Sequence, residues 1–205
     1  FRKIEQEPMQ LHLVDCPVST LMKSIFQRFK PFFVLKNVQF EYTCNNEGLI
    51  ARVDEENLTK VVSNLLNNAG KYTKDKVELA LITHEESHQF EIRVTDNGVG
   101  VPQDEQTNIF KPFYQVSVGN KPGTGIGLYL VKTIVDACDG IIKVQSEPGQ
   151  GSIFSVFLPI ISPDSDSVLA DGLTIPTKEA MEDKPLPEVE KVEPGNEMSV
   201  VLVVE

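Results

Sequence analysis

The sequence predicts a single α/β domain with tails, and three observations support this prediction. The chain has 205 residues, which gives room for one full hydrophobic core and a substantial appendage. Apolar residues recur at helical spacing in some stretches and alternate with polar residues in others, as in strands. Hydrophobic residues make up 40% of the chain and charged residues 24%, which indicates a globular protein rather than a disordered or membrane one.

The first predicted elements are a short strand over residues 11–15 and a helix that begins at Pro17. Alternation indicates the strand, and apolar residues at helical spacing as far as Phe29 indicate the helix. Pro31 should kink or end this helix, because proline lacks a backbone N–H and its ring clashes with the preceding turn.

Two strands and a helix cap come next. Residues 38–43 and 49–53 alternate as strands, and Asn45-Asn46-Glu47-Gly48 supplies a turn between them. We therefore expect the two strands to pair as a hairpin. Asp54 then provides a side chain that can cap the following helix.

The longest predicted helix covers residues 55–72. Its apolar residues form one stripe, while Asn64, Asn68 and Lys71 recur at positions i, i+4 and i+7 on another face. The apolar stripe should face the core, which leaves the polar face for function.

The second half of the chain surrounds a long irregular segment. Residues 77–83 and 89–95 predict two strands joined by a polar turn, and Asp96-Asn97-Gly98-Val99-Gly100 ends the second strand. The stretch from there to Gly123 is too long for a simple connection and is a candidate lid. The last predicted elements are a helix over 124–138 and strands over 141–146 and 152–159.

The composition changes after Ile161. Residues 162–197 contain ten acidic residues, three basic residues and five prolines, which predicts a solvated linker. Residues 198–205 are apolar and β-rich, like the first buried strand of a further parallel-sheet domain, although a tail packed on the domain is an alternative. Because the chain begins at Phe1 without Met, we expect a piece of a longer protein.

Charge and cysteine usage narrow the possible partners. The formal net charge is -11, which argues against nucleic acid because phosphate backbones are bound by clustered Lys and Arg. Cys16, Cys44 and Cys138 are far apart in sequence, as expected for reduced thiols in the cytosol. From the sequence we expect no signal peptide, and no apolar run is long enough to span a bilayer.

The polar face of the helix over residues 55–72 predicts part of a nucleotide site. A carboxamide at Asn64 can give a neutral oxygen to Mg²⁺, Asn68 lies one turn later, and Lys71 adds a cation for phosphate oxygens. Taken alone, this pattern fits an ordinary polar helix surface equally well.

Two glycine-containing motifs could complete such a site. Asp96 ends an apolar strand and is followed by Gly98 and Gly100, so a buried carboxylate could accept the amino hydrogen of adenine. The segment 123–128, Gly-Thr-Gly-Ile-Gly-Leu, opens the next helix, where backbone amides and the helix dipole favour phosphate. It lacks the Lys-Ser/Thr of a P-loop and the glycine spacing of a dinucleotide fingerprint.

The order of these segments resembles the sensor histidine kinases. The resemblance covers roughly residues 11–159 and includes a later glycine turn, Glu147-Pro148-Gly149-Gln150-Gly151-Ser152-Ile153-Phe154. The matching segments are 64–73, 96–100, Ile109-Phe110-Lys111-Pro112-Phe113-Tyr114, and 123–128. Four individually weak motifs in one order make a strong one.

The resemblance implies a Bergerat-type α/β sandwich, with a mixed sheet of five or more strands covered on one face by three helices and a lid over ATP. It implies that Asn64 binds Mg²⁺ and that Asn64 and Lys71 are the catalytic residues. Asn68 and Lys71 would contact phosphates, Tyr72 would line the nucleotide site, and Asp96 would bind adenine.

The resemblance also implies roles for residues of the glycine motifs and the lid. Gly98 and Gly100 would support the adenine, and Ser152 would assist Asp96 through water. Ile109 would belong to the site, and Phe110 and Phe113 would anchor the lid, with plain core packing as the alternative for the two phenylalanines. The phosphates would be held by backbone amides of Gly123, Thr124, Gly125, Ile126, Gly127 and Leu128.

Two departures from related patterns affect the expected chemistry. Lys60 stands one helical turn before Asn64, where hydrolytic relatives of this fold carry a glutamate general base, and a protonated lysine cannot activate water. Pro112 and Gln115 stand where many family members carry lid arginines, and Lys111 or Lys121 could replace that charge.

One motif resembles a zinc site but is not expected to bind zinc. The segment His84-Glu85-Glu86-Ser87-His88 matches the metalloprotease pattern. It lies between two predicted strands instead of on a helix, so a solvated hairpin turn is the better interpretation.

The resemblance implies a protein-histidine kinase domain with ATP and Mg²⁺ as cofactors. The expected partners are a dimerisation domain that carries the acceptor histidine and a receiver domain that begins at residues 198–205. His12, His84 and His88 lack the acceptor's sequence context, so the acceptor should lie upstream of residues 1–10, the expected tail of that domain. We expect the catalytic domain at 11–161, a monomeric fragment without direct membrane contact, and a cytoplasmic location within a membrane-anchored bacterial sensor.

Two rival functions remain open at this stage. One is an ATPase of the chaperone, gyrase or mismatch-repair type, against which Lys60 argues. The other is a degenerate module that binds nucleotide only to shape protein contacts, which the altered lid residues allow.

Overall fold

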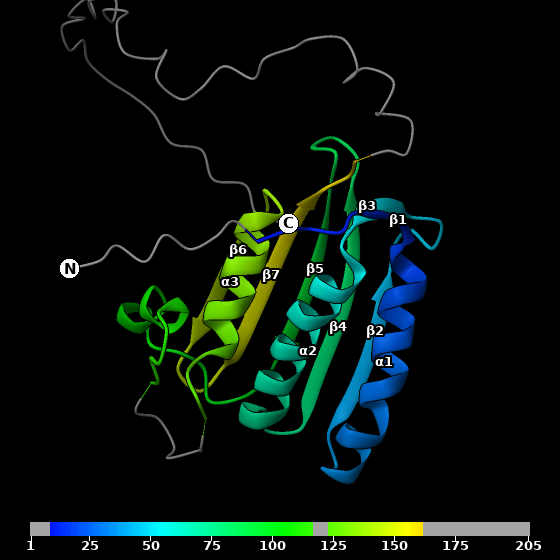
Figure 1. The fold of residues 1–205 in the computed structure, drawn as a ribbon. Coiled ribbons are helices and arrows are strands. Elements are labelled where there is room, and N and C mark those ends of the chain that lie inside the picture. The colour runs from blue at the N-terminus through cyan, green and yellow to red at the C-terminus, as the bar shows by residue number, and fades with distance from the viewer. Residues whose placement is uncertain (1–8, 117–122, 162–205) are drawn as a thin grey trace, which may run out of the picture. The chain divides into compact units, whose positions relative to one another are not determined.

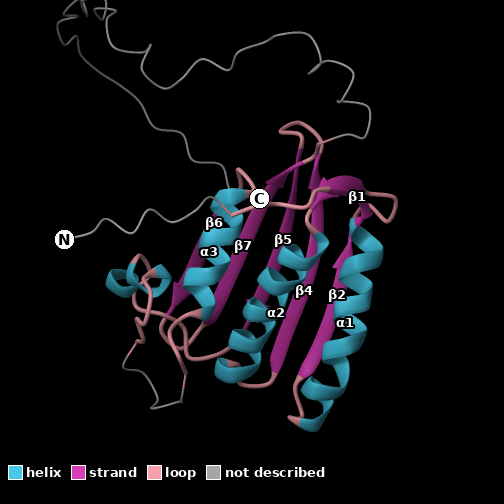
Figure 2. Cartoon of the chain, in the orientation of Figure 1, coloured by secondary structure: helices cyan, strands magenta, loops and turns pink. Residues whose placement is uncertain are grey.

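Three helices cover one face of a five-stranded sheet in the computed structural model, which describes residues 9–116 and 123–161. Figures 1 and 2 show these helices side by side over the same face. The predicted α/β sandwich is therefore confirmed. The elements are β1 Val14–Pro17, α1 Val18–Leu35, β2 Gln39–Cys44, β3 Ile50–Val53, α2 Glu55–Tyr72, β4 Lys76–His84, β5 Gln89–Asp96, α3 Gly127–Ala137, β6 Ile141–Glu147 and β7 Gly151–Pro159, with short 3-10 turns η1 Gln103–Glu105 and η2 Asn108–Phe110.

Several predictions fall on other parts of the chain. Four predictions lie wholly or mostly outside the described residues: the upstream tail 1–10, of which residues 1–8 are outside, Lys121 as a replacement cation, the linker 162–197 and the strand 198–205. Among the described helices, none is both long and apolar enough to cross a membrane.

The main sheet is mixed and has the strand order β2-β4-β5-β7-β6. Strand β2 runs parallel to β4, while the β4–β5, β5–β7 and β6–β7 pairs are antiparallel. In the central strands, alternate residues face the helices and are fully buried, among them Leu79, Ile92 and Val156. This face and the apolar stripes of the helices form one core.

The predicted hairpin between residues 38–43 and 49–53 is wrong. Strand β3 pairs antiparallel with β1 in a separate two-stranded sheet, and β2 pairs parallel with β4. The cause is aromatic packing against α1, since the ring of Phe40 lies 4.7 Å from that of Phe26 and 4.4 Å from that of Phe33. This contact holds β2 under α1 and beside β4, away from β3.

Helix α1 does not end at Pro31. It continues to Leu35, and Phe33 within this last turn is fully buried. Burial of a large aromatic side chain favours the helical path by about 1.5–3 kcal/mol, which offsets the hydrogen bond that proline cannot donate.

Helix α2 agrees with the prediction over its whole length. The Oδ1 atom of Asp54 accepts the backbone N–H of Asn57 at 2.9 Å, so Asp54 caps the helix as expected. The helix buries the apolar stripe Leu58, Val61, Val62, Leu65, Leu66 and Ala69. The stripe fixes the rotation of the helix and so directs its polar face toward the start of α3.

Helix α3 begins at Gly127, three residues later than predicted. Gly125 has φ +69°, a left-handed conformation that a right-handed helix cannot contain. The loop amides of residues 123–126 are thus left outside the helix, in front of its first turn.

Candidate functional site

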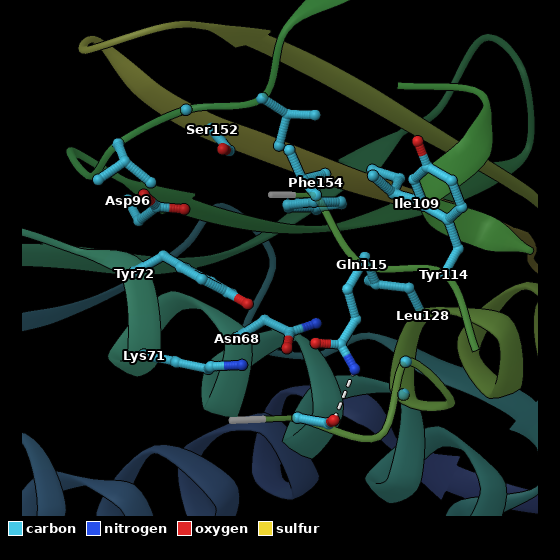
Figure 3. A pocket seen from close by; sticks show the side chains of 17 residues that line it. Asn68, Lys71, Tyr72, Asp96, Ile109, Tyr114, Gln115, Leu128, Ser152 and Phe154 are labelled. Atoms are coloured by element: carbon cyan, nitrogen blue, oxygen red, sulfur yellow. Dashed lines mark hydrogen bonds between the residues drawn. The ribbon is translucent and has the colours of Figure 1, made fainter. Parts of the chain in front are cut away.

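A cavity opens between the second half of α2, the start of α3 and the ends of β5 and β7 (Figure 3). Its lining comes from four separated parts of the chain: α2, the end of β5 with the loop after it, the first turn of α3 with the loop before it, and β7. Most residues that the sequence singled out line it, namely Asn68, Lys71, Tyr72, Asp96, Gly100, Ile109, Gly123, Gly125, Gly127, Leu128 and Ser152. In Figure 3, Asp96 and Ser152 lie on one side, Asn68 and Lys71 on the other, and Tyr72 between them.

Asp96 is a buried acceptor at one end of the cavity. Asp96 is 6% exposed, and its Oδ1 atom accepts a hydrogen bond from the backbone N–H of Gly98 at 2.8 Å. Burial raises the pKa of the Asp96 carboxyl group, and the N–H groups of Gly98 and Ser152 oppose this shift without reversing it. A buried carboxylate that lines the cavity can accept a further donor from a ligand.

The glycines after Asp96 are required for backbone packing. A β-carbon on Gly98 would lie 2.2 Å from the backbone oxygen of Tyr72. Gly100 has φ +69°, and a β-carbon there would lie 2.0 Å from the backbone oxygen of Glu147. The two glycines thus let the loop lie against α2 and β6; Gly100 lines the cavity, whereas Gly98 is not among the lining residues.

The other end of the cavity combines a cation with glycine backbone. The Nζ atom of Lys71 lies 4.7 Å from the ring centroid of Tyr72, and a β-carbon on Gly123 would lie 2.8 Å from that Nζ. Gly123, Gly125 and Gly127 line the cavity here. A cation beside backbone amides in front of a helix suits an anionic group.

Asn64 is outside the lining residues but next to them. Its Nδ2 atom donates to the backbone oxygen of Lys60 at 2.8 Å, and its Oδ1 atom would lie 2.9 Å from a β-carbon on Gly127. The carboxamide oxygen is therefore directed toward the start of α3. Its predicted role stays a prediction.

The two sides of the lid are joined at the base. The N–H of Phe113 donates to the backbone oxygen of Gly125 at 3.0 Å, and the Nε2 atom of Gln115 donates to that of Gly123 at 2.6 Å. The Tyr114 hydroxyl group also hydrogen-bonds Glu105. These bonds hold Tyr114 and Gln115 at the cavity.

The two phenylalanines of the lid differ. Phe110 packs against the hydrophobic core, while Phe113 is 75% exposed and has φ +64°. Core packing is therefore wrong for Phe113. Thr124 and Ile126 are also exposed, and with Phe110 they are not among the lining residues.

Several lining residues were not predicted from the sequence, namely Val99, Val101, Tyr114, Val116 and Phe154. Gln115 was noted only as a departure at a lid position, and it also lines the cavity. Phe154 had a usable signal, since residues two apart in a strand face the same side and Ser152 had been identified. The loop residues Val99 and Val101 had none, because their direction depends on the packing of Gly98 and Gly100.

The metalloprotease-like segment lies where the sequence predicted. His84 is the last residue of β4, and His88 lies in the turn before β5 with φ +50°. The two imidazoles therefore do not lie one turn apart on a helix.

Comparisons with known proteins identify the family of the chain. Residues 53–162 match the family model described as "Histidine kinase-, DNA gyrase B-, and HSP90-like ATPase". The chain is 35% identical over 164 residues to the sensor histidine kinase RcsC of Escherichia coli K12, covering 78% of this chain and 17% of RcsC. It is 32% identical over 160 residues to the alginate biosynthesis sensor protein KinB of Pseudomonas aeruginosa, covering 78% of this chain and 27% of KinB.

Solved structures show the same fold. Full-length ShkA in complex with AMPPNP matches with a TM-score of 0.70 and 25% identity, over 76% of this chain and 33% of ShkA. The nucleotide-free catalytic domain of the histidine kinase ThkA matches with a TM-score of 0.65 and 21% identity, over 73% of this chain and 97% of that domain. The chain thus spans about a sixth of the length of RcsC and about a quarter of that of KinB, and 73% of it shares the fold of the ThkA domain.

Proposed function

Because the chain belongs to the family of histidine kinase-, DNA gyrase B- and HSP90-like ATPases, we propose that it is the ATP-binding catalytic domain of a sensor histidine kinase. It transfers the γ-phosphoryl group of ATP to a histidine on a dimerisation domain, from which a receiver aspartate takes it. The observation that carries the proposal is one cavity with a buried carboxylate at one end and a lysine beside glycine backbone at the other.

The side chains at the Asp96 end of the cavity fit a purine. A carboxylate that is buried and aimed into the cavity accepts an exocyclic amino hydrogen. The apolar side chains of Val99, Ile109 and Phe154 line the same cavity and suit the faces of a flat ring.

The opposite end fits a triphosphate with Mg²⁺. Lys71 and the amides of residues 123–127 supply positive charge for phosphate oxygens. Asn64 and Asn68 supply neutral carboxamide oxygens for the metal, and the bond from Asn64 Nδ2 to Lys60 leaves Oδ1 directed toward Gly127. Mg²⁺, when bound, would neutralise charge on the phosphate oxygens during transfer.

This chain's own residues supply positioning and charge, since phosphoryl transfer needs little covalent help. Lys60 forms an ion pair with Glu56 at 2.7 Å between Nζ and Oε1. A cation at this position cannot take a proton from water, which supports transfer to a histidine over hydrolysis.

The first test is nucleotide binding by the chain. Wild type should bind ATP with Mg²⁺ by titration calorimetry, and Asp96→Ala should lose most of the affinity. Asp136→Ala is the matched control, because this exposed acid on α3 pairs with Lys132 and its removal changes the net charge equally. Equal binding by wild type and Asp96→Ala would end the proposal.

The second test separates transfer from its rivals. The chain joined to a histidine-bearing dimerisation domain should form acid-labile phosphate from ATP. Appreciable steady-state hydrolysis by the chain alone would favour an ATPase, and binding without phosphorylation of the joined domain would favour a degenerate module.

The parent protein and its assembly are part of the same proposal. We propose a catalytic domain over residues 11–161, a linker over 162–197 and a receiver domain beginning at 198–205, within the cytoplasmic part of a bacterial sensor. The fragment itself should be a monomer, and a stable dimer in light scattering would contradict this.

A further inference from the structure

Ser146 lies behind the purine end of the cavity and makes three hydrogen bonds through one hydroxyl group. It is on β6 and is not among the residues that line the cavity. Its Oγ atom accepts the backbone N–H of Val101 at 2.7 Å and donates to the backbone oxygen of Gly151 at 2.8 Å. The same Oγ lies 3.0 Å from the Oγ of Ser152, which does line the cavity.

The direction of the bond between the two serines follows from a count of protons. A serine hydroxyl has one hydrogen and two lone pairs. The carbonyl oxygen of Gly151 can only accept, so it takes the single hydrogen of Ser146. Ser152 must therefore donate its hydrogen to Ser146, which uses both lone pairs of Ser146, one for Val101 and one for Ser152.

This arrangement fixes what Ser152 offers to a ligand. With its hydrogen directed at Ser146, the Ser152 Oγ atom presents only lone pairs to the cavity. The Asp96 carboxylate is also an acceptor. It lies beside Ser152 because the pairing of β5 with β7 places these two residues opposite each other. Two acceptors at one end of the cavity favour a ligand that carries a donor there.

We infer that Ser146 is a positioning residue that holds Ser152 as an acceptor and so selects purines with a 6-amino group over those with a 6-keto group. The inference rests on the proposed function, because it concerns the same nucleotide site. A 6-keto oxygen in direct contact would face two acceptors, with no hydrogen between them. A bridging water molecule would not supply one, because both of its hydrogens are already attracted by the two acceptors. Sites of this kind reject the wrong partner because their own polar groups are left unpaired.

The surrounding bonds keep Ser146 in place. The Nε2 atom of Gln106 donates to the backbone oxygens of Ser146 at 2.7 Å and Val101 at 3.1 Å. Ser146 thereby connects the loop after β5 with β6 and β7. A purely structural role would weaken all nucleotides alike, whereas the inferred role changes the preference between them.

The test compares ATP with inosine triphosphate, which has a 6-keto group. Wild type should bind ATP more tightly. In Ser146→Ala, the Ser152 hydroxyl is free to turn its hydrogen into the cavity, so the ratio of the two dissociation constants should fall about tenfold. Ser146→Thr keeps the hydroxyl group and should keep the wild-type ratio.

Two further variants complete the design. Ser155→Ala is the matched control. This serine is also buried on β7, but it faces the other side of the sheet, beside Glu91. The ratio of the two dissociation constants should stay unchanged in this variant. Ser152→Ala should reduce the preference for ATP, with Asp96 keeping the rest, even if Ser146→Ala fails to fold, as melting curves would show.

The outcomes separate this inference from the proposed function. Loss of ATP and inosine triphosphate binding in equal proportion in Ser146→Ala, or an unchanged ratio in Ser152→Ala, overturns the inference while the nucleotide site stands. Absence of binding by wild type overturns both.

Discussion

A β-carbon on Gly127 would lie 2.9 Å from the Oδ1 atom of Asn64. The middle of α2 and the first turn of α3 can therefore approach this closely because residue 127 is glycine. The close approach brings a carboxamide oxygen beside the loop that we propose for phosphate. Glycine here serves contact between two helices, in addition to any contact with a ligand.

Gly127→Ala should weaken binding of ATP with Mg²⁺ without destabilising the domain. The added methyl group displaces the Asn64 carboxamide, so we expect about a tenfold loss of affinity with Mg²⁺ and little change without it. Alanine is a better helix former than glycine, by up to about 1 kcal/mol, so the melting temperature should not fall. Calorimetric titrations with and without Mg²⁺ check this, and an identical loss in both would contradict it.

Gly100→Ala should destabilise the domain strongly. A β-carbon there would lie 2.0 Å from the Glu147 backbone oxygen at φ +69°, and we expect a loss of at least about 2 kcal/mol in the free energy of unfolding. Gly149→Ala is the control, because Gly149 has φ +82° with nothing within 4 Å, which leaves about 1 kcal/mol of backbone strain. Urea unfolding of both variants checks the difference.

Arg93→Met should destabilise the domain through Glu91, a carboxylate on the sheet face opposite the helices. The Glu91 side chain is 1% exposed and pairs with Arg93, whose Nε lies 2.7 Å from Oε1. Removing the cation leaves a buried charge with only Ser155 and His84 as described partners. This should cost about 2–3 kcal/mol, less than the ~3–5 kcal/mol for a fully buried pair because Arg93 is 41% exposed. The added change Glu91→Gln should recover most of the loss in urea unfolding.

The same carboxylate should contribute to acid unfolding. Burial raises the pKa of Glu91, but hydrogen bonds from Arg93, Ser155 and His84 outweigh burial and hold the pKa below 4.5. The stabilisation is present above pH 4.5 and is lost as the pH falls through the lowered pKa of the folded state. The unfolding free energy of Glu91→Gln should therefore depend less on pH below 4.5 than that of wild type.

Cys16 should make the domain less stable at alkaline pH. The thiol is 1% exposed, and burial, with the nearby Glu55, raises its pKa from 9.0 to about 12. Above pH 9 the unfolded thiol loses its proton while the folded one keeps it, so stability falls by up to ~1.4 kcal/mol per pH unit. Cys16→Ala should lack this part of the slope between pH 9 and 11 in urea unfolding.

Local patterns predicted the elements that carry the site. The apolar stripe of α2 and the Asp54 cap define that helix within a few residues of sequence, and both appear as predicted. Asp96 could be singled out because it ends a strand whose alternate residues are buried. Neither conclusion required knowledge of the distant chain.

Strand partners could not be predicted in the same way. A polar turn between residues 38–43 and 49–53 favours a hairpin, but the partner of β2 was decided by aromatic contacts with α1. The start of α3 was set by the left-handed Gly125, where a β-carbon would lie 2.6 Å from the Phe113 backbone carbon. Such contacts join residues far apart in sequence, so they leave no local pattern.

The parallel pairing of β2 with β4 makes α2 part of the connection between them, over residues 45–75. To form the parallel pair, the chain must close this long loop before the contacts between the two strands stabilise it. Closing such a loop is a slow step in folding. The carboxamides and lysine of α2 meet the other cavity residues only after that step. ATP should therefore slow the unfolding of the domain while leaving its refolding rate unchanged.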